Sequence, residues 1–298
     1  MAHCQANASR PSSFLLLGKG RFLILTLLLI MMGSVAGIRA AQAEDGRAIL
    51  LKAIRLYHTF HSYKGQANVD TLMIGTDGKV IKHVGSSSTM KFQRPNKISL
   101  FIQNPAGSRA VYGDGSNFSV FEASTNQYST VPMSGKEPEM ITLLRKQAGV
   151  VAGLDTLFLL TETSLPKTLT NLQYKGTSTC NGHPVFVVTG TTSATPELSG
   201  GGKTSMPGAA TEWTWWIDRQ SYLLYKVENK TSNVVKPVSF GSGNNAVVKD
   251  VKGTVIMRYI VSEIKPDANI TPSDFAFTPP KSAIQKRTIQ EILGGQKK

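Results

Sequence analysis

The stretch Thr211–Lys230 constrains the fold more than any other part of the chain, because it holds all three tryptophans. Two runs of β-forming residues, Glu212–Ile217 and Tyr222–Glu228, flank the polar tetrapeptide Asp218–Ser221. Apolar and aromatic runs on either side of a short polar segment are typical of a β-hairpin. This stretch therefore predicts two antiparallel strands joined by a four-residue loop.

The tryptophans of this hairpin raise the main question about the protein. Side chains alternate between the two faces of a strand, so Trp213, Trp215 and Ile217 share one face and Trp216 lies on the other. Two tryptophans on one face need a large apolar partner. That partner is either a packed core or a cavity that holds an apolar ligand, and the residue pattern alone favours the core.

The N-terminal segment has the features of a secretory signal peptide. Its apolar run Phe22–Met32 follows the basic residues Arg10, Lys19 and Arg21, and the small-residue site Ala41–Ala43 comes shortly afterwards. We therefore expect residues 1–43 to be a leader that is cleaved after Ala43, which places the protein in the periplasm. An uncleaved anchor is the alternative, but the run is shorter than the roughly 20 residues that span a bilayer.

The remaining chain, residues 44–298, is expected to be a single domain. The leader carries four basic residues and no acidic one, so this domain has 29 basic and 19 acidic residues and a net charge of +10. Such a charge favours anionic neighbours such as a membrane surface, or an envelope protein as partner. The basic residues are scattered rather than clustered with aromatic residues, which argues against nucleic acid. Cys180 is the only cysteine after the leader.

The order of elements predicts an α+β fold. A helix over Asp45–His61 precedes a strand that begins at Tyr63, and a long antiparallel meander follows. The small residues of Gly85–Thr89 indicate a bulge, an edge or a close neighbour. The other expected segments are helices over Glu139–Gln147, Leu154–Thr161 and Ser282–Leu293, loops over Thr192–Ala210 and Val234–Val247, and a closing strand around Phe275 and Phe277. The sum is a single, highly curved antiparallel sheet with covering helices.

The sequence contains no recognisable arrangement of catalytic residues. It has neither a G-x-S-x-G nor an H-E-x-x-H motif. Gly202-Lys203-Thr204 resembles the end of a P-loop, but Glu197 stands where that motif needs a glycine. His58 and His61 could share a helix face, yet no third ligand is evident. We therefore expect no catalytic residues, no metal and no cofactor, and a protein that is not an enzyme.

Several short motifs occur in an order that resembles the LolA/LolB-like superfamily of periplasmic lipoprotein carriers. Within that superfamily the chain is most similar to a family of predicted periplasmic proteins of unknown function. The motifs are Phe92–Ile98, Tyr112–Gly115, Asn181–Val185, Trp216–Arg219 and Phe275–Pro280.

The resemblance implies an unclosed β-barrel wrapped round helices that act as a lid over a hydrophobic cavity. It assigns no particular arginine to the role of holding the lid. We expect the cavity to bind a lipid or the acyl chains of a lipoprotein. By strand alternation its lining would be Val69, Met73, Met90, Phe92, Leu100, Trp213, Trp215 and Ile217, with Leu157 and Leu160 from the lid.

A second hypothesis gives the same fold a filled core. In that case the protein is an interaction or sensor module of the periplasm, and its function lies on the outer surface. The basic charge and the two long loops Thr192–Ala210 and Val234–Val247 favour this alternative. Cavity and core produce the same alternation of residues, so the sequence leaves both open.

Overall fold

The structure is a computed structural model of the whole chain, and it describes residues 45–134, 137–144, 156–192, 210–240 and 247–294. The expected leader and the loop Thr192–Ala210 lie almost entirely outside these residues. Within them, no helix is both long enough and apolar enough to cross a membrane.

The described strands form one sheet, in the order β12-β6-β5-β4-β3-β2-β1-β11-β10-β9-β8-β7. Neighbouring strands are antiparallel, except that β12 pairs with β6 in parallel over two residues. The strands are β1 Ser62–Gly75, β2 Val80–Gln93, β3 Lys97–Asn104, β4 Gly107–Gly113, β5 Asn117–Glu122, β6 Gln127–Pro132, β7 Leu169–Cys180, β8 His183–Thr192, β9 Thr211–Asp218, β10 Leu224–Phe240, β11 Val247–Pro266 and β12 Ile284–Gln285.

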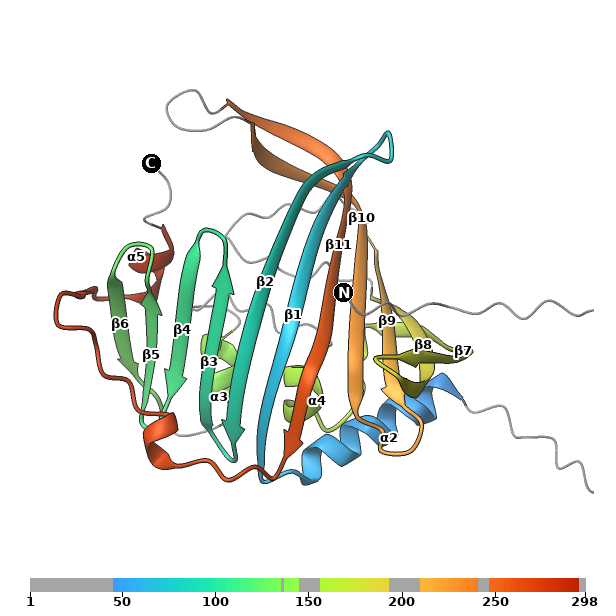
Figure 1. Cartoon of the computed structure of the whole chain (residues 1–298), viewed down its shortest axis with the longest axis horizontal. Coiled ribbons are helices and arrows are strands. Elements are labelled where there is room, and N and C mark those ends of the chain that lie inside the picture. Colours follow the sequence, from blue (N-terminus) through green and yellow to red (C-terminus); the bar gives the residue numbers. More distant parts are fainter. Residues whose placement is uncertain (1–44, 135–136, 145–155, 193–209, 241–246, 295–298) are drawn as a thin grey trace, which may run out of the picture.

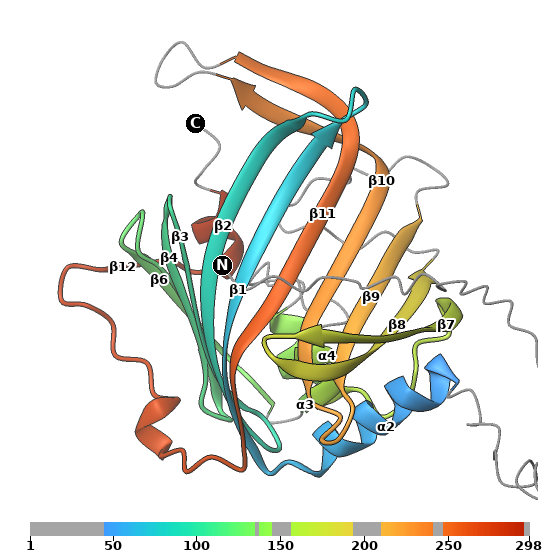
Figure 2. The same cartoon turned by 45° about the vertical axis from the view of Figure 1, so that its right-hand side comes forward.

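This sheet curves strongly and does not close, because β7 and β12 at its two ends do not pair with each other (Figure 1). The helices are α2 Gly46–Thr59, α3 Glu137–Thr142, α4 Thr156–Thr161 and α5 Ile289–Gly294. Figure 2 shows α3 and α4 in the concavity of the sheet, with α2 across one end of it. The expected fold class, an α+β protein built on one unclosed antiparallel sheet with covering helices, is therefore confirmed.

Helix α2 forms where the sequence predicts a helix. Asp45 caps its N-terminus and accepts a hydrogen bond from the backbone N–H of Arg47 at 3.0 Å. Its apolar face, which includes Leu50, Ile54 and Tyr57, is buried. At Gly46 a Cβ atom would lie only 2.7 Å from the backbone carbon of Gln173, so the absence of a side chain lets α2 pack directly against β7.

The tryptophan hairpin is confirmed as β9 and β10. Asp218 fixes its loop, because the carboxylate oxygen Oδ1 accepts hydrogen bonds from the backbone N–H groups of Gln220 at 3.0 Å and Ser221 at 2.7 Å. This is the usual role of aspartate in a turn. The register pairs Trp213 with Asn229 and Trp215 with Val227.

The structure has different outcomes for the two predictions about the long strands, one for Val234–Val247 and one for β2. The segment Val234–Val247 is not a loop over its whole length, because Val234–Phe240 extends β10 and pairs with Val247–Gly253 of β11. Of the three alternatives for Gly85–Thr89, the edge applies to Gly85 and Ser86, since β3 pairs only from Ser87 onward and leaves Val80–Ser86 with β1 as its single neighbour. The four strands β1, β2, β10 and β11 therefore extend beyond the rest of the sheet (Figure 1).

The chain after β11 differs from the expectation as well. Phe275 and Phe277 do not form a closing strand. They belong to a segment that we call the C-terminal strap, residues 267–285, which crosses the outer face of β4–β6 and ends in β12. Helix α5 then begins at Ile289, later than predicted, and buries Ile289 in the main core. Ile292 is buried as well. The strap thus passes round the free edge of β6.

Cys180 ends β7 as expected and is fully buried.

Candidate functional site

The inner face of the sheet carries a continuous apolar surface. The strand register places Tyr63 opposite Phe92, Phe92 opposite Ile98, and Ile98 opposite Gly113. The next row along the strands includes Met90, Leu100, Val111 and Val120. Side chains from both rows belong to the main hydrophobic cluster together with Trp213, Trp215 and Ile217. The inner face is therefore one surface that spans most of the sheet.

Trp213 and Trp215 form the broadest part of this surface. Their rings stack with 6.2 Å between centroids and 11° between ring planes. The indole Nε1 of Trp213 donates a hydrogen bond to Thr192 Oγ1 at 3.2 Å, which satisfies the polar atom of that side chain at the edge of the surface. Trp216 points to the outer face, where Lys226 Nζ lies 4.0 Å from its ring centroid.

Helices α2 and α4 cover this surface. Leu157 and Leu160 of α4 pack into the main cluster, and the buried residues of α2 contact it from the other side. The hydroxyl of Tyr57 accepts a hydrogen bond from the backbone N–H of Leu224 at 3.1 Å, which fixes α2 to β10. Burial raises the pKa of Tyr57 well above its ordinary value, so this phenol stays neutral.

Arg94, between β2 and β3, holds the two covering helices together. Its guanidinium donates from Nε to the carbonyl oxygen of Phe60 at 3.0 Å and from Nη2 to that of Leu160 at 2.6 Å. A longer bond from Nη2 reaches the carbonyl of Tyr57 at 3.4 Å. One side chain thus joins the sheet to the C-terminal ends of both helices. Carbonyl groups at the C-terminal end of a helix are exposed to the negative end of its dipole, which is why a cation suits the position.

The role of Arg94 could not be predicted from the sequence. The partners of Arg94 are backbone carbonyls of residues 34 to 66 positions away, and no local pattern indicates such a contact. The only available indication was the Phe92–Ile98 motif in which Arg94 stands.

Polar pairs interrupt the apolar inner face at two places. Thr211 and Thr231 lie opposite each other on β9 and β10, are both buried, and share a hydrogen bond of 2.9 Å. At another part of the inner face, Arg109 pairs with Glu122 at 2.9 Å. At these two places the main apolar surface is therefore bordered by polar groups that satisfy each other.

The ten residues predicted to line a cavity separate into three groups. Eight lie in the main cluster and are at most 6% exposed, namely Met90, Phe92, Leu100, Leu157, Leu160, Trp213, Trp215 and Ile217. Met73 is buried elsewhere, in a small cluster with Val234 and Val255. Val69 is partly exposed on β1 and belongs to neither cluster. The structure brings together the eight and separates Met73 and Val69 from them.

The described residues contain no group of three or more histidine, cysteine, aspartate or glutamate side chains that could hold a metal ion. His58 lies near the Arg94 guanidinium, and partial burial together with that positive charge lowers the pKa of its imidazole. A neutral imidazole beside the arginine leaves the hydrogen bonds of Arg94 undisturbed.

Comparison with solved structures finds proteins of similar fold at low sequence identity. The lipoprotein LppX of Mycobacterium tuberculosis is 18% identical, with 74% of this chain and 98% of that chain covered and a TM-score of 0.37. LprF from Mycobacterium bovis is 14% identical over 80% and 97% of the two chains, with a TM-score of 0.37. A LolA superfamily protein from Nitrosomonas europaea is 15% identical over 79% and 99%, with a TM-score of 0.31.

No curated protein matches the chain. A family model described as "Predicted periplasmic protein (DUF2092)" matches residues 46–236, which begin with α2 and run into β10. The match takes in both covering helices, Arg94 and the tryptophan hairpin. Since it spans more than half of the sequence, the chain belongs to this family of predicted periplasmic proteins.

Proposed function

We propose that this protein is a non-catalytic binding protein of the periplasm that holds a lipid, or the acyl chains of a lipoprotein, between the inner face of its sheet and helices α2 and α4. The observation that carries the proposal is the nature of the cover. A broad apolar surface that contains two stacked tryptophans is covered by helices, one of them only six residues long.

An acyl chain can enter only when this cover opens. The eight clustered residues are almost fully buried, so an acyl chain reaches them only when α2 or α4 moves away from the sheet. The acyl chain that enters can replace the apolar contacts between the displaced helix and the sheet, because each buried CH₂ group of the acyl chain contributes about 0.8 kcal/mol to the binding free energy. Arg94 is the natural control point, because its hydrogen bonds join both helices to the sheet.

The location of the protein supports a lipid as ligand. Its family is described as periplasmic, and residues 1–43 have the pattern of a cleaved leader. The net charge of +10 on the remaining chain favours contact with anionic head groups. We infer that the protein meets its ligand at a membrane surface or on an envelope protein.

Native mass spectrometry of protein purified from the periplasm without detergent tests the proposal. We expect a discrete added mass that disappears after extraction with organic solvent, and we expect the delipidated protein to take up a fluorescent fatty acid. A bare mass together with no uptake of the fatty acid would contradict the proposal.

One observation favours a second function. The eight residues expected to line a cavity pack against one another and are at most 6% exposed, as in a filled core. In that case the protein is an interaction or sensor module, and its partner binds the outer surface. Affinity capture from periplasmic extract, in parallel with the mass measurement, separates the two: a specific protein partner with no lipid mass supports this second function.

A further inference from the structure

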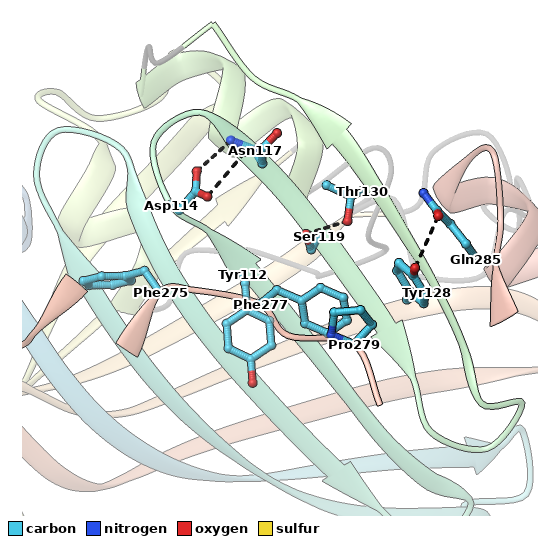
Figure 3. Close-up of a pocket in the computed structure, with 10 residues that line it drawn as sticks. All are labelled: Tyr112, Asp114, Asn117, Ser119, Tyr128, Thr130, Phe275, Phe277, Pro279 and Gln285. Carbon is cyan, nitrogen blue, oxygen red and sulfur yellow. Dashed lines mark hydrogen bonds between the residues drawn. The ribbon is translucent and has the colours of Figure 1, made fainter. Parts of the chain in front are cut away.

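A pocket on the outer face of the sheet is independent of the inner-face site. It has a volume of about 280 Å³ and lies between strands β4–β6 and the C-terminal strap (Figure 3). The share of liquid volume per water molecule is about 30 Å³, so the pocket has room for roughly nine waters. This is enough for one small organic molecule.

The strap is fixed on both sides of the pocket. Before it, Asp274 forms an ion pair with Lys91 of β2, and the Phe275 side chain is buried. After it, the backbone N–H of Ile284 donates to the Asn126 carbonyl at 2.9 Å, and that of Lys286 donates to the Tyr128 carbonyl at 2.7 Å. The pocket is therefore formed by the fold itself, which reduces the ordering cost of binding.

Small hydroxyl side chains form the floor of the pocket. Ser119 on β5 lies opposite Tyr112 on β4 and Thr130 on β6. The Ser119 and Thr130 hydroxyls share a hydrogen bond of 2.9 Å, and each hydroxyl has one donor and two acceptor positions. The pair therefore keeps capacity to bind a further polar group. The hollow exists because these two residues are small and their neighbours are large.

The ends of the pocket are also polar. At one end, Asp114 accepts backbone hydrogen bonds at Oδ1 from Ser116 and Asn117, both at 2.7 Å. Burial opposes ionisation of this carboxyl, but these hydrogen bonds outweigh it and lower its pKa. At the other end, the Tyr128 hydroxyl donates to Gln285 Oε1 at 3.2 Å, and the Gln285 amide retains its two N–H donors.

Aromatic rings complete the walls. Phe277 of the strap lies with its ring centroid 5.5 Å from that of Tyr112 and 5.5 Å from that of Tyr128, and Phe275 and Pro279 also line the space. Among the residues that line it there is one carboxylate and no lysine, arginine or histidine. Such a lining repels anions and combines flat apolar surfaces with hydrogen-bonding groups.

We propose that this outer pocket binds a single neutral sugar ring, whose hydroxyl groups bond to the Ser119–Thr130 pair, Asp114 and Gln285 while its C–H face packs on the aromatic wall. The ring can come from a free monosaccharide or from the exposed end of an envelope glycan. Both sources offer the same neutral, hydroxyl-rich ring.

Titration of the mature protein with D-glucose and N-acetyl-D-glucosamine, followed by ¹H–¹⁵N NMR and saturation-transfer difference spectra, tests the proposal. We expect a Kd on the order of 1 mM for at least one of them, which suits a ligand of about twelve to fifteen heavy atoms, with shifts confined to β4–β6 and the strap. Methyl glycosides and a chitotetraose probe distinguish the sources: tighter binding of the tetrasaccharide indicates a glycan end, and its exclusion indicates a free sugar.

Matched variants show whether the pocket itself is responsible. Thr130→Phe fills the space and should weaken sugar binding at least tenfold, whereas Thr130→Ser keeps the hydroxyl and should change it less than threefold. If Thr130→Phe fails to fold, the double variant Ser119→Ala/Thr130→Val removes the hydroxyls without filling the space and should also weaken binding. None of these changes should alter acyl-probe uptake at the inner face.

Three results would overturn the proposal. The first is that no sugar probe shows saturable binding. The second is that choline, a cation, binds in place of sugar. The third is that the wild type, Thr130→Phe and Ser119→Ala/Thr130→Val bind sugar equally well. If the wild-type protein binds sugar but takes up no acyl probe, that result contradicts the inner-face function alone.

Discussion

The inner and outer faces of the sheet come from the same alternating strands but are covered in different ways. On the inner face, helices α2, α3 and α4 cover a broad apolar surface, and Arg94 joins α2 and α4 to the sheet. On the outer face, an extended strap crosses only β4–β6 and leaves a pocket with a polar floor. A helix can leave an apolar surface and be replaced by an acyl chain, whereas a strap that is fixed on both sides preserves a rigid pocket. The same sheet thus supports two kinds of site.

Substitution of the tryptophans should give the largest difference in stability between the two faces. Trp215→Ala removes a fully buried ring from the inner face and should lower the free energy of unfolding by about 3–5 kcal/mol. Trp216→Ala, one residue along on the outer face, loses mainly its contact with Lys226 and should cost about 1 kcal/mol. Urea denaturation of the two variants measures the difference, and equal losses would show that the two faces are not distinct.

Arg94 tests how the inner cover is held. Arg94→Met removes hydrogen bonds to the carbonyls of Phe60 and Leu160, and the partly buried carbonyls left without partners should cost about 2–3 kcal/mol. Hydrogen exchange should speed up in α4 and at the end of α2 more than in the strands. Arg94→Lys is the matched control, because it keeps the charge but lacks the planar guanidinium fork that spans the carbonyls of both helices. Uniform acceleration over the whole sheet would contradict a role specific to the cover.

The extended strands offer a third comparison, between two parts of the inner face. Met73→Ala should cost about 2 kcal/mol, at the lower end for a buried methionine, because its cluster with Val234 and Val255 is small. Faster hydrogen exchange should be confined to the extensions of β1, β2, β10 and β11. Acyl-probe uptake should not change, since Met73 lies outside the main cluster. Loss of uptake in this variant would show that the binding surface extends along the strands.

The attachment of the outer strap predicts a small effect of pH. The side-chain hydrogen bond from Lys91, with those from Thr271, lowers the pKa of Asp274 to about 2. A lowered carboxyl pKa stabilises the folded chain above the ordinary value of about 3.9, and this stabilisation is lost as pH falls toward 2. NMR shifts of Phe275 and Phe277 should therefore move with a midpoint near pH 2. Asp274→Asn should abolish that transition, and an unchanged transition in this variant would assign it to another group.

The sequence predicted the sheet better than it predicted what covers the sheet. Alternation and turn residues such as Asp218 are local features, so the tryptophan hairpin and most of the meander followed from them. The run Gly241–Asn245 predicts a loop over Val234–Val247, yet Val234–Phe240 pairs with β11 and extends β10. The strap was missed although Thr271 and Asp274 form a capping box, which argues against a strand there.

The candidate site shows the same limit. The inward side of each strand could be read from alternation, which placed six of the eight predicted strand residues in the main cluster, and the two residues predicted from the lid joined them. The position along a strand could not, and Met73 therefore falls in a separate cluster on the extended strands. Val69 belongs to neither cluster, although the register places it in the same row as Trp215. Arg94 and the outer pocket depend on contacts between segments far apart in sequence, so neither could be found from local pattern.

The most direct test of the inner-face site uses the tryptophans as reporters. A fatty acid brominated along its chain quenches an indole only on close contact, so we compare the Trp216→Phe variant, which keeps the inner pair, with the Trp213→Phe/Trp215→Phe variant, which keeps only the outer ring. Circular dichroism verifies that both are folded. The account predicts saturable quenching in the first variant and little in the second. Equal quenching in both, or none in the first, would contradict the claim that acyl chains bind between the sheet and its covering helices.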